Sequence, residues 1–573
     1  AATMNTTHLG LLVLLGPAVF TLLAAFSHLR SAKAAWGVRC ALLLLALGVV
    51  IYGVLNGGTP LPSTEWLMIP GQSAVIQLGW YADSSARLLV AAVALLALVT
   101  LVALPDSVSR TDTSLLLLAS AATHVVLIGE HLLVRLAAAE ILLLMVLLLV
   151  VSVTTRIQRL VLGQRVAEGL LLLVSLVIGG HRSVVDVQGP DRIDFWVPAL
   201  VIAAVMALGG CFPFHRGLLA LQSCAPVQRA HLSSLLLLAS GGLLLRLTND
   251  PAVADLWATR AMWFAIPAAL TGLMSLASTD LRRAQMWSWS SQLAFAILVT
   301  LHFGTEPVVG VWICLALVRP AASLAADTVI TALGGDASAA RWGGLASALP
   351  AVCWMSVIAA ACVAGLPPLG LFALNTQLLA PLVPTSHVFA LAAALPAILI
   401  LPAMRVGFWP FFGPPRHRVL AQRGQTALSP LVVTVVIGSA VLGALATLAL
   451  MLESAVVPPL PALATAALVA ITLGLITQLL GRHRRQDESV PVPGLLRQYV
   501  GDGAYLPRAS AAWIPTVLRH LTWMIEGLAL LPGAIAQMLR AAGWGVTWLE
   551  SRPLWWVCLT VAGIALAILG GRQ

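Results

Sequence analysis

Apolar residues recur along the chain in runs of about 20, and short polar connections separate these runs. About 20 consecutive apolar residues are what an α-helix needs to cross the hydrocarbon core of a bilayer. We therefore predict an all-α, multi-pass membrane protein with about 14–17 transmembrane helices. The predicted spans lie near 9–26, 39–56, 87–104, 113–129, 132–153, 166–180, 195–212, 231–247, 262–278, 288–303, 308–332, 347–365, 368–383, 388–409, 428–451, 461–480 and 554–570.

Two regions interrupt this rhythm. The first, "GGHRSVVDVQGPDRID" at 179–194, reads as a polar loop. The second covers 481–553 and begins with the charged, proline-rich stretch "GRHRRQDESVPVPG". Within it, residues 505–550 mix arginines with tryptophans in a sequence of helical character. That segment is too polar to cross a membrane and too apolar for a solvated tail. It is therefore predicted to form an amphipathic helix along the membrane or along a neighbouring protein.

Composition and charge place the chain in a lipid environment. Of its 573 residues, 60% are hydrophobic and 9% are charged, and the mean hydropathy is +0.97. Soluble domains carry roughly 25% charged residues, so a soluble fold is excluded. The net charge of +10 comes mostly from short connections such as "HLRSAKAAWGVR" and "TTRIQR". This pattern is typical of the cytoplasmic loops of a multi-pass protein, here expected in the cell's inner (plasma) membrane. The scattered basic residues do not indicate nucleic-acid binding.

The sequence gives no sign of a cofactor in this chain. Its seven cysteines include no C-x-x-C and lie mostly inside apolar runs, which argues against an iron–sulfur or zinc site. There is no phosphate loop and no G-x-G-x-x-G. We therefore expect no metal, no nucleotide and no redox or hydrolytic centre.

Four local patterns, in one order, resemble a known family. They are "CFPFHRGLLALQSCAPV" (211–227), "TDLRRAQMWSWSSQLAF" (279–295), "RWGGLASALP" followed by "VAGLPPLGLF", and "MRVGFWPFFGPPR" (404–416). Each resembles a segment of the antiporter-like subunits of respiratory complex I. With the predicted lateral helix, the chain looks most like the distal, L-type subunit of NADH:quinone oxidoreductase. The same superfamily includes membrane subunits of energy-converting hydrogenases, Mrp-type sodium/proton antiporters and the membrane half of a two-part inorganic-carbon transporter.

The resemblance implies a fold with an inverted repeat of two five-helix bundles, each with a helix broken near the membrane centre. Pro213 and Pro320 fall at suitable places for the two breaks. The expected organisation is 1–110 N-terminal transmembrane helices, 111–260 first antiporter-like half, 261–420 second half, 421–480 C-terminal core helices, 481–553 linker and lateral helix, and 554–573 final transmembrane helix.

The ionisable residues of the family are largely lost from this chain. By motif alignment, the family's relay lysines fall on Leu208 and Arg319, and the lysine or glutamate of a later motif falls on Asn375. A buried lysine can release its proton, whereas arginine stays charged. Lys33 is the only lysine in the sequence, and it lies in a predicted interhelical loop. What remains is Glu140, which aligns with the family's key glutamate, and we expect its partner on another helix.

The candidate ion-pathway residues each have a structural alternative. The candidates are Glu140, His215, His231, Arg319 and Asp327, with Asp280, Arg282 and Arg246 as further charged candidates. Asp327 follows Arg319 by eight residues and could share its face. The histidines could be hydrogen-bonded core residues. Ser233 and Ser234, beside His231, could line a hydrated cavity or bond their own helix. Arg282 could extend to the interface, and the tryptophans near span ends read as interfacial anchors.

Three functions are compatible with these observations. The first is a proton- or cation-translocating membrane subunit of a complex I-like assembly, with degenerate relay residues. The second is a subunit that has lost pumping and serves as a docking platform for its partners. The third is the membrane half of an inorganic-carbon (bicarbonate or CO2) uptake complex, working with a soluble zinc protein. In the first two, other membrane and peripheral subunits and the lipid bilayer are the expected partners.

Overall fold

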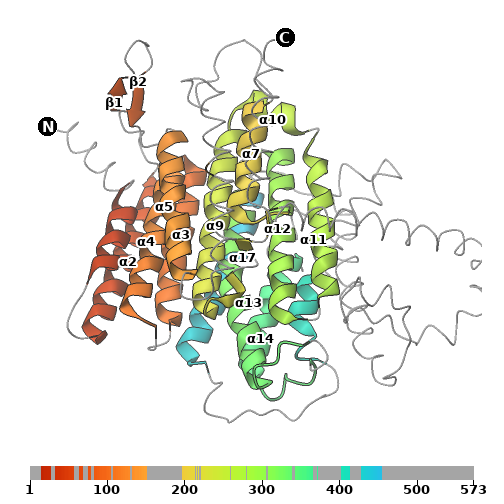
Figure 1. Cartoon of the computed structure of the whole chain (residues 1–573). Helices are drawn as coiled ribbons and strands as arrows, with labels where there is room; N and C mark the ends of the chain where they lie inside the picture. The colour runs from red at the N-terminus through yellow and green to blue at the C-terminus, as the bar shows by residue number, and fades with distance from the viewer. Residues whose placement is uncertain are drawn as a thin grey trace, which may run out of the picture.

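The helices of the structure, a computed structural model, run side by side as a bundle, with the N-terminal helices at one edge (Figure 1). The structure describes residues 15–27, 32–56, 64–68, 75–78, 83–104, 108–129, 132–150, 169, 196–212, 214–215, 217–218, 221–258, 260–278, 280–304, 308–338, 342–365, 371, 402–412 and 428–453. The predicted spans 461–480 and 554–570 and the predicted lateral helix lie outside the described residues. So does the span 368–383 except for residue 371, and the span 166–180 except for Gly169.

Most of the described helices fall on the predicted apolar runs, and the short helix over 251–258 lies between two of these runs. The described helices are α2 (Ala32–Asn56), α3 (Ser84–Ala103), α4 (Arg110–Ile128), α5 (Leu132–Val150), α7 (Trp196–Gly209), α9 (Pro226–Thr248), α10 (Pro251–Ala258), α11 (Ala265–Ala277), α12 (Leu281–Phe303), α13 (Val309–Ala332), α14 (Pro350–Ala364) and α17 (Pro430–Glu453), with short 3-10 turns η1 (Leu221–Ser223) and η2 (Ala261–Phe264). Within the described part, six helices, α2, α3, α4, α9, α13 and α17, are long and apolar enough to cross a membrane. The chain is thus a helical, multi-pass membrane protein.

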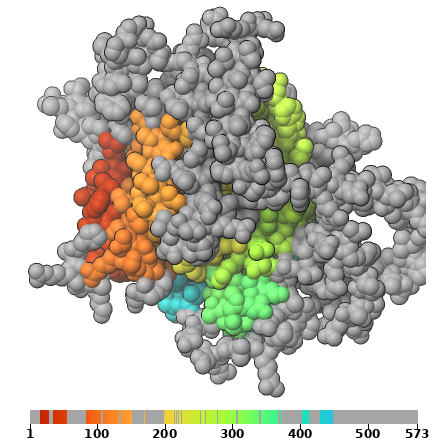
Figure 2. All heavy atoms as spheres, viewed as in Figure 1, coloured from red at the N-terminus to blue at the C-terminus, as the bar shows by residue number. Residues whose placement is uncertain are grey.

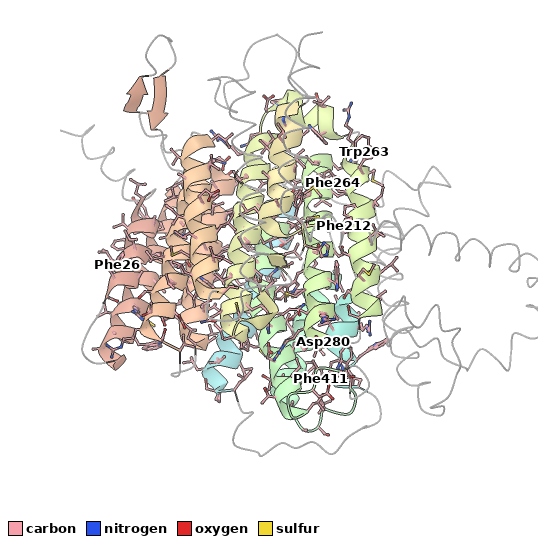
Figure 3. All side chains as sticks on the ribbon, viewed as in Figure 1. Phe26, Phe212, Trp263, Phe264, Asp280 and Phe411 are labelled. Atoms are coloured by element: carbon pink, nitrogen blue, oxygen red, sulfur yellow. The ribbon has the colours of Figure 1, made fainter. Side chains whose placement is uncertain are left out.

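The centre of the bundle is formed by α9, α12 and α13. The apolar windows of α9 and α13 are 94% buried, against 28% for the outer helix α2, so these two helices contact protein on almost every side. Outer helices instead present large apolar side chains to the surroundings. Phe26 and Trp263 are 60% and 63% exposed and project from opposite edges of the bundle (Figure 3). The side chains of the N-terminal helices also form a broad surface (red to orange in Figure 2). Lipid is the solvent that such surfaces fit.

One short sheet departs from the all-α expectation. Strands β1 (Thr64–Met68) and β2 (Val75–Leu78) form an antiparallel hairpin in the connection between α2 and α3. It stands apart from the helices at one end of the bundle (Figure 1). Trp66, Val75 and Ile76 are residue types that favour strands, but each run is too short to rise above the helical pattern around it.

The first predicted helix break agrees with the structure, and the second is wrong. The helix α7 ends at Gly209, just before Pro213, and Gly210 follows with a φ of +76°. In contrast, α13 runs without interruption through Pro320. Proline deprives the carbonyl four residues earlier of its helical partner. Here that carbonyl, of Ala316, accepts a hydrogen bond of 2.8 Å from Ser234 Oγ on α9. The helix continues because a neighbouring helix supplies the missing donor.

Candidate functional site

A buried carboxylate on α13 joins three helices. Asp327 forms ion pairs with Arg229 of α9 and with Arg282 of α12, whose Nη2 lies 2.8 Å from Asp327 Oδ1. Arg282 Nε also donates to the same oxygen at 2.9 Å. Arg229 is fully buried, Asp327 is 6% exposed and the side chain of Arg282 is 39% exposed, so the cluster lies at the edge of the core.

The start of α12 brings Arg282 to this cluster. Asp280 precedes the helix, and its side chain accepts a hydrogen bond of 3.0 Å from the backbone N–H of Arg283, which caps the helix. Figure 3 shows Asp280 at the lower end of α12 in this view. From its sequence position, Arg282 was expected to extend to the membrane interface. Its side chain is partly exposed, and it also pairs with Asp327. Asp280 acts as a cap and is not part of the ion-pair cluster.

Arg319, near the middle of α13, is 1% exposed and has a different environment. Its Nη1 donates to the backbone carbonyl of Ser233 on α9, and its guanidinium carbon lies 5.0 Å from the ring centroid of Trp289 on α12. Nε and Nη2 are buried without a hydrogen-bond partner among the described residues. The predicted proximity of Asp327 to Arg319 gives no ion pair in this part of the chain.

The tryptophan beneath Arg319 corrects a prediction. Trp289 is 2% exposed, and Trp312 at the start of α13 is fully buried with its Nε1 donating to Thr300 Oγ1 at 3.0 Å. Both were expected to be interfacial anchors because they lie near predicted span ends. They are core residues because other helices, rather than lipid headgroups, surround these two side chains.

His231 is a fully buried, hydrogen-bonded residue between helices. Its Nδ1 lies 2.7 Å from Thr100 Oγ1 on α3, and its Nε2 lies 2.9 Å from Ser120 Oγ and 3.2 Å from the carbonyl of Leu116 on α4. A carbonyl can only accept, so Nε2 carries the proton and Nδ1 accepts from the Thr100 hydroxyl in the neutral ring. The two serines beside it are also hydrogen-bonded: Ser233 to the carbonyl of Ala230 and Ser234 to Ala316.

The end of α7 and the residues that follow it hold two further positions singled out from the sequence. Leu208, where the family resemblance places a lysine, is completely buried. His215 is 7% exposed and stacks on Phe212 at 5.4 Å and on Trp287 of α12 at 4.5 Å between ring centroids. Figure 3 shows Phe212 inside the bundle. This aromatic packing fixes the imidazole beside the interruption of the helix.

Glu140 lies half-buried on α5, whereas the Asp327 cluster is formed by α9, α12 and α13. Its Oε1 lies against Gly169, where a Cβ would clash with the carboxylate. Arg135, five residues earlier, is buried and donates to the carbonyls of Gly129 at 2.5 Å and Gly242 at 3.3 Å. The partner predicted for Glu140 on another helix stays a prediction.

The remaining candidates lie elsewhere. Arg246 is in the last turn of α9 and lines a small cavity with Asp83 and Arg135. Asn375 lies outside the described residues. No group of three or more His, Cys, Asp or Glu side chains that could hold a metal ion occurs in the described part of the chain.

Sequence reasoning missed Arg229 and His124. Arg229 is as deeply buried as Arg319 and is one of the two arginines that pair with Asp327. His124 is fully buried on α4, one turn from Ser120. Neither falls on a motif position of the family. The available signal was the residue type alone, because an ionisable group inside a membrane span marks a functional candidate by default.

Comparison with known proteins agrees with this architecture. Residues 130–400 match the family described as NADH:quinone oxidoreductase/Mrp antiporter, transmembrane. A solved structure titled as the Mrp complex from Dietzia sp. DQ12-45-1b is similar in fold, with a TM-score of 0.62 and 20% sequence identity over 92% of this chain. The chain spans 60% of the length of that matched chain. Among curated proteins, none matches this sequence.

Proposed function

We propose that this chain is an antiporter-like membrane subunit of the NADH:quinone oxidoreductase/Mrp antiporter superfamily, a proposal supported by the family match and the similar fold. It works within a multi-subunit cation-translocating membrane assembly of the complex I type. In this proposal its central charges set the electric field of the core and do not relay protons. The observation that carries it is Arg319, a buried guanidinium at the position where the family resemblance places a relay lysine.

A proton relay needs groups that gain and lose a proton. Arginine stays protonated in proteins, and leucine has no ionisable group, so neither Arg319 nor Leu208 can cycle. Asp327 has a carboxylate, but it is bound in ion pairs to two arginines. Arg319 and Asp327 therefore support a fixed charge pattern on α13, and Leu208 of α7 adds no relay group.

A second function, a non-pumping docking subunit, is favoured by the same lost groups. It keeps the family's fold and partners but assigns ion movement to other chains of the assembly. The third function, carbon uptake with a soluble zinc protein, differs from both in its partner. The partners therefore separate the third function from the first two.

The experiment is affinity purification of the tagged chain from its native membrane in mild detergent, followed by identification of the proteins that remain bound. We expect several other membrane subunits, together with peripheral redox subunits if the assembly is of the complex I type. Recovery of a single soluble zinc protein as the stoichiometric partner would contradict the proposal and favour carbon uptake. Recovery of the chain alone would also contradict it.

A further inference from the structure

We propose that Arg319 and the polar side chains around it bind a small monovalent anion of about the size of chloride. The site is the cavity between α12, α13, α14 and the segment 402–408. The inference is independent of the function proposed above, because it concerns what neutralises one buried cation.

Arg319 carries a charge that its protein contacts do not balance. The described residues give it one carbonyl, from Ser233, and the face of Trp289, while Nε and Nη2 lack partners. A carbonyl and an aromatic face attract a cation but leave its net charge unchanged. An uncompensated charge inside a membrane span is costly, so a counter-charge in contact with the guanidinium is favoured.

The helices around Arg319 offer no carboxylate for this purpose. Neither α9 nor α12 contains an aspartate or glutamate, and none occurs in the sequence between Asp336 and Glu453, which includes α14 and the segment 402–408. On α13 the one carboxylate, Asp327, is already held by Arg229 and Arg282. The local surplus is therefore positive, and an anion from solution would offset it.

The cavity beside Arg319 has the size and the donors for such an ion. Its volume is about 30 Å³, and a cavity needs at least about 10–15 Å³ to hold one water. The room suits one small ion with at most a water.

Hydrogen-bond donors converge on the same space. Gln285 lines the cavity, is 1% exposed, and has no partner for either amide atom among the described residues. Gln292 donates to Ser288 Oγ at 3.1 Å, so the Ser288 hydroxyl proton is directed elsewhere and can be donated. With Arg319, these groups supply charged and neutral donors that line one cavity, and a buried halide needs donors of both kinds. Water alone would satisfy Gln285 but would leave the charge of Arg319 unbalanced.

The test is the apparent melting temperature of the purified full-length protein in detergent, with sodium chloride replacing sodium gluconate at constant ionic strength. The proposal predicts a saturable rise of about 2–3 °C at chloride concentrations roughly 100- to 1,000-fold above half-saturation. Bromide should act like chloride, and gluconate, which exceeds the cavity, should not. Identical melting in chloride and gluconate would overturn the proposal.

Two variants test whether chloride binds in this cavity, and two further variants serve as controls. Arg319→Gln should abolish the chloride-dependent rise, and Gln285→Ala should raise the half-saturating chloride concentration by about 10-fold, because it removes one donor to an anion. Arg39→Gln, at a buried arginine of α2, and Ser290→Ala, at a buried hydroxyl of α12 that does not line the cavity, should keep the full rise. If Arg319→Gln does not fold, Gln285→Ala decides. An unchanged chloride response in Gln285→Ala, or in a folded Arg319→Gln, places the anion elsewhere and refutes the site.

Discussion

The hydroxyl of Ser234 on α9 donates a 2.8 Å hydrogen bond to the carbonyl of Ala316 on α13, the carbonyl that Pro320 leaves without a helical donor. A second serine, Ser439 of α17, lies 3.4 Å from the next carbonyl, that of Leu317. Neighbouring helices thus satisfy the backbone at the proline, as a lipid environment demands. Side chains of two neighbouring helices therefore allow α13, which carries Arg319 and Asp327, to continue through the proline.

Ser234→Ala should destabilise the protein by about 1–3 kcal/mol, since it leaves the buried carbonyl of Ala316 unsatisfied. Ser233→Ala is the matched control, because among the described residues the Ser233 hydroxyl bonds the carbonyl of Ala230 in its own helix and no group of α13. We expect a clear loss of apparent melting temperature for the first variant and a much smaller one for the second. Equal losses would show that Ser234 does not support α13.

Asp327→Asn should be among the most damaging single changes in the core. It leaves the buried Arg229 without its counter-charge, and breaking a buried pair from one side costs about 3–5 kcal/mol. Asp280→Asn makes the same chemical change at a helix cap, where asparagine serves as well as aspartate. Thermal unfolding in detergent should therefore separate the two variants widely, and similar melting temperatures would argue against the Asp327 cluster.

Close packing of α13 on α17 gives a prediction about glycine. A Cβ added at Gly310 would lie 2.6 Å from the backbone Cα of Thr447, so the two helices would have to separate. Overpacking of this kind costs about 1–3 kcal/mol. At Gly438 of α17 nothing lies within 4 Å of an added Cβ, and alanine there should be neutral or slightly stabilising through its helix propensity. A melting temperature unchanged in Gly310→Ala would contradict this packing.

The sequence predicted the helices well because run length and apolar character are local properties. The family resemblance together with Pro213 predicted the interruption after α7. The same reasoning misjudged Pro320, since the donor from Ser234 comes from a helix that is about 80 residues away in sequence. Whether a proline breaks a helix inside a protein depends on such partners.

Which charged residues form ion pairs could not be predicted from the local sequence either. Residues eight apart on a helix differ in direction by about 80°, so Asp327 faces Arg229 and Arg282 while Arg319 faces Ser233 and Trp289. Which residues meet depends on how α9, α12 and α13 pack, and no spacing within one helix encodes it. The inverted repeat, the domain boundaries and the lateral helix stay predictions.

The central claim, that Arg319 is a fixed charge and that this chain does not relay protons by the family's usual route, is tested most directly by proton flux. The assembled complex is reconstituted into vesicles, and flux per assembled complex is compared among wild type, Arg319→Ala and Glu140→Gln. We predict flux that is unchanged within about twofold in both variants after normalisation to assembly, because Arg319 stays charged and Leu208 has no ionisable group, so neither variant removes a working relay step. A robust wild-type flux that is lost in Glu140→Gln, with assembly intact, would contradict the account and show a working path through this subunit.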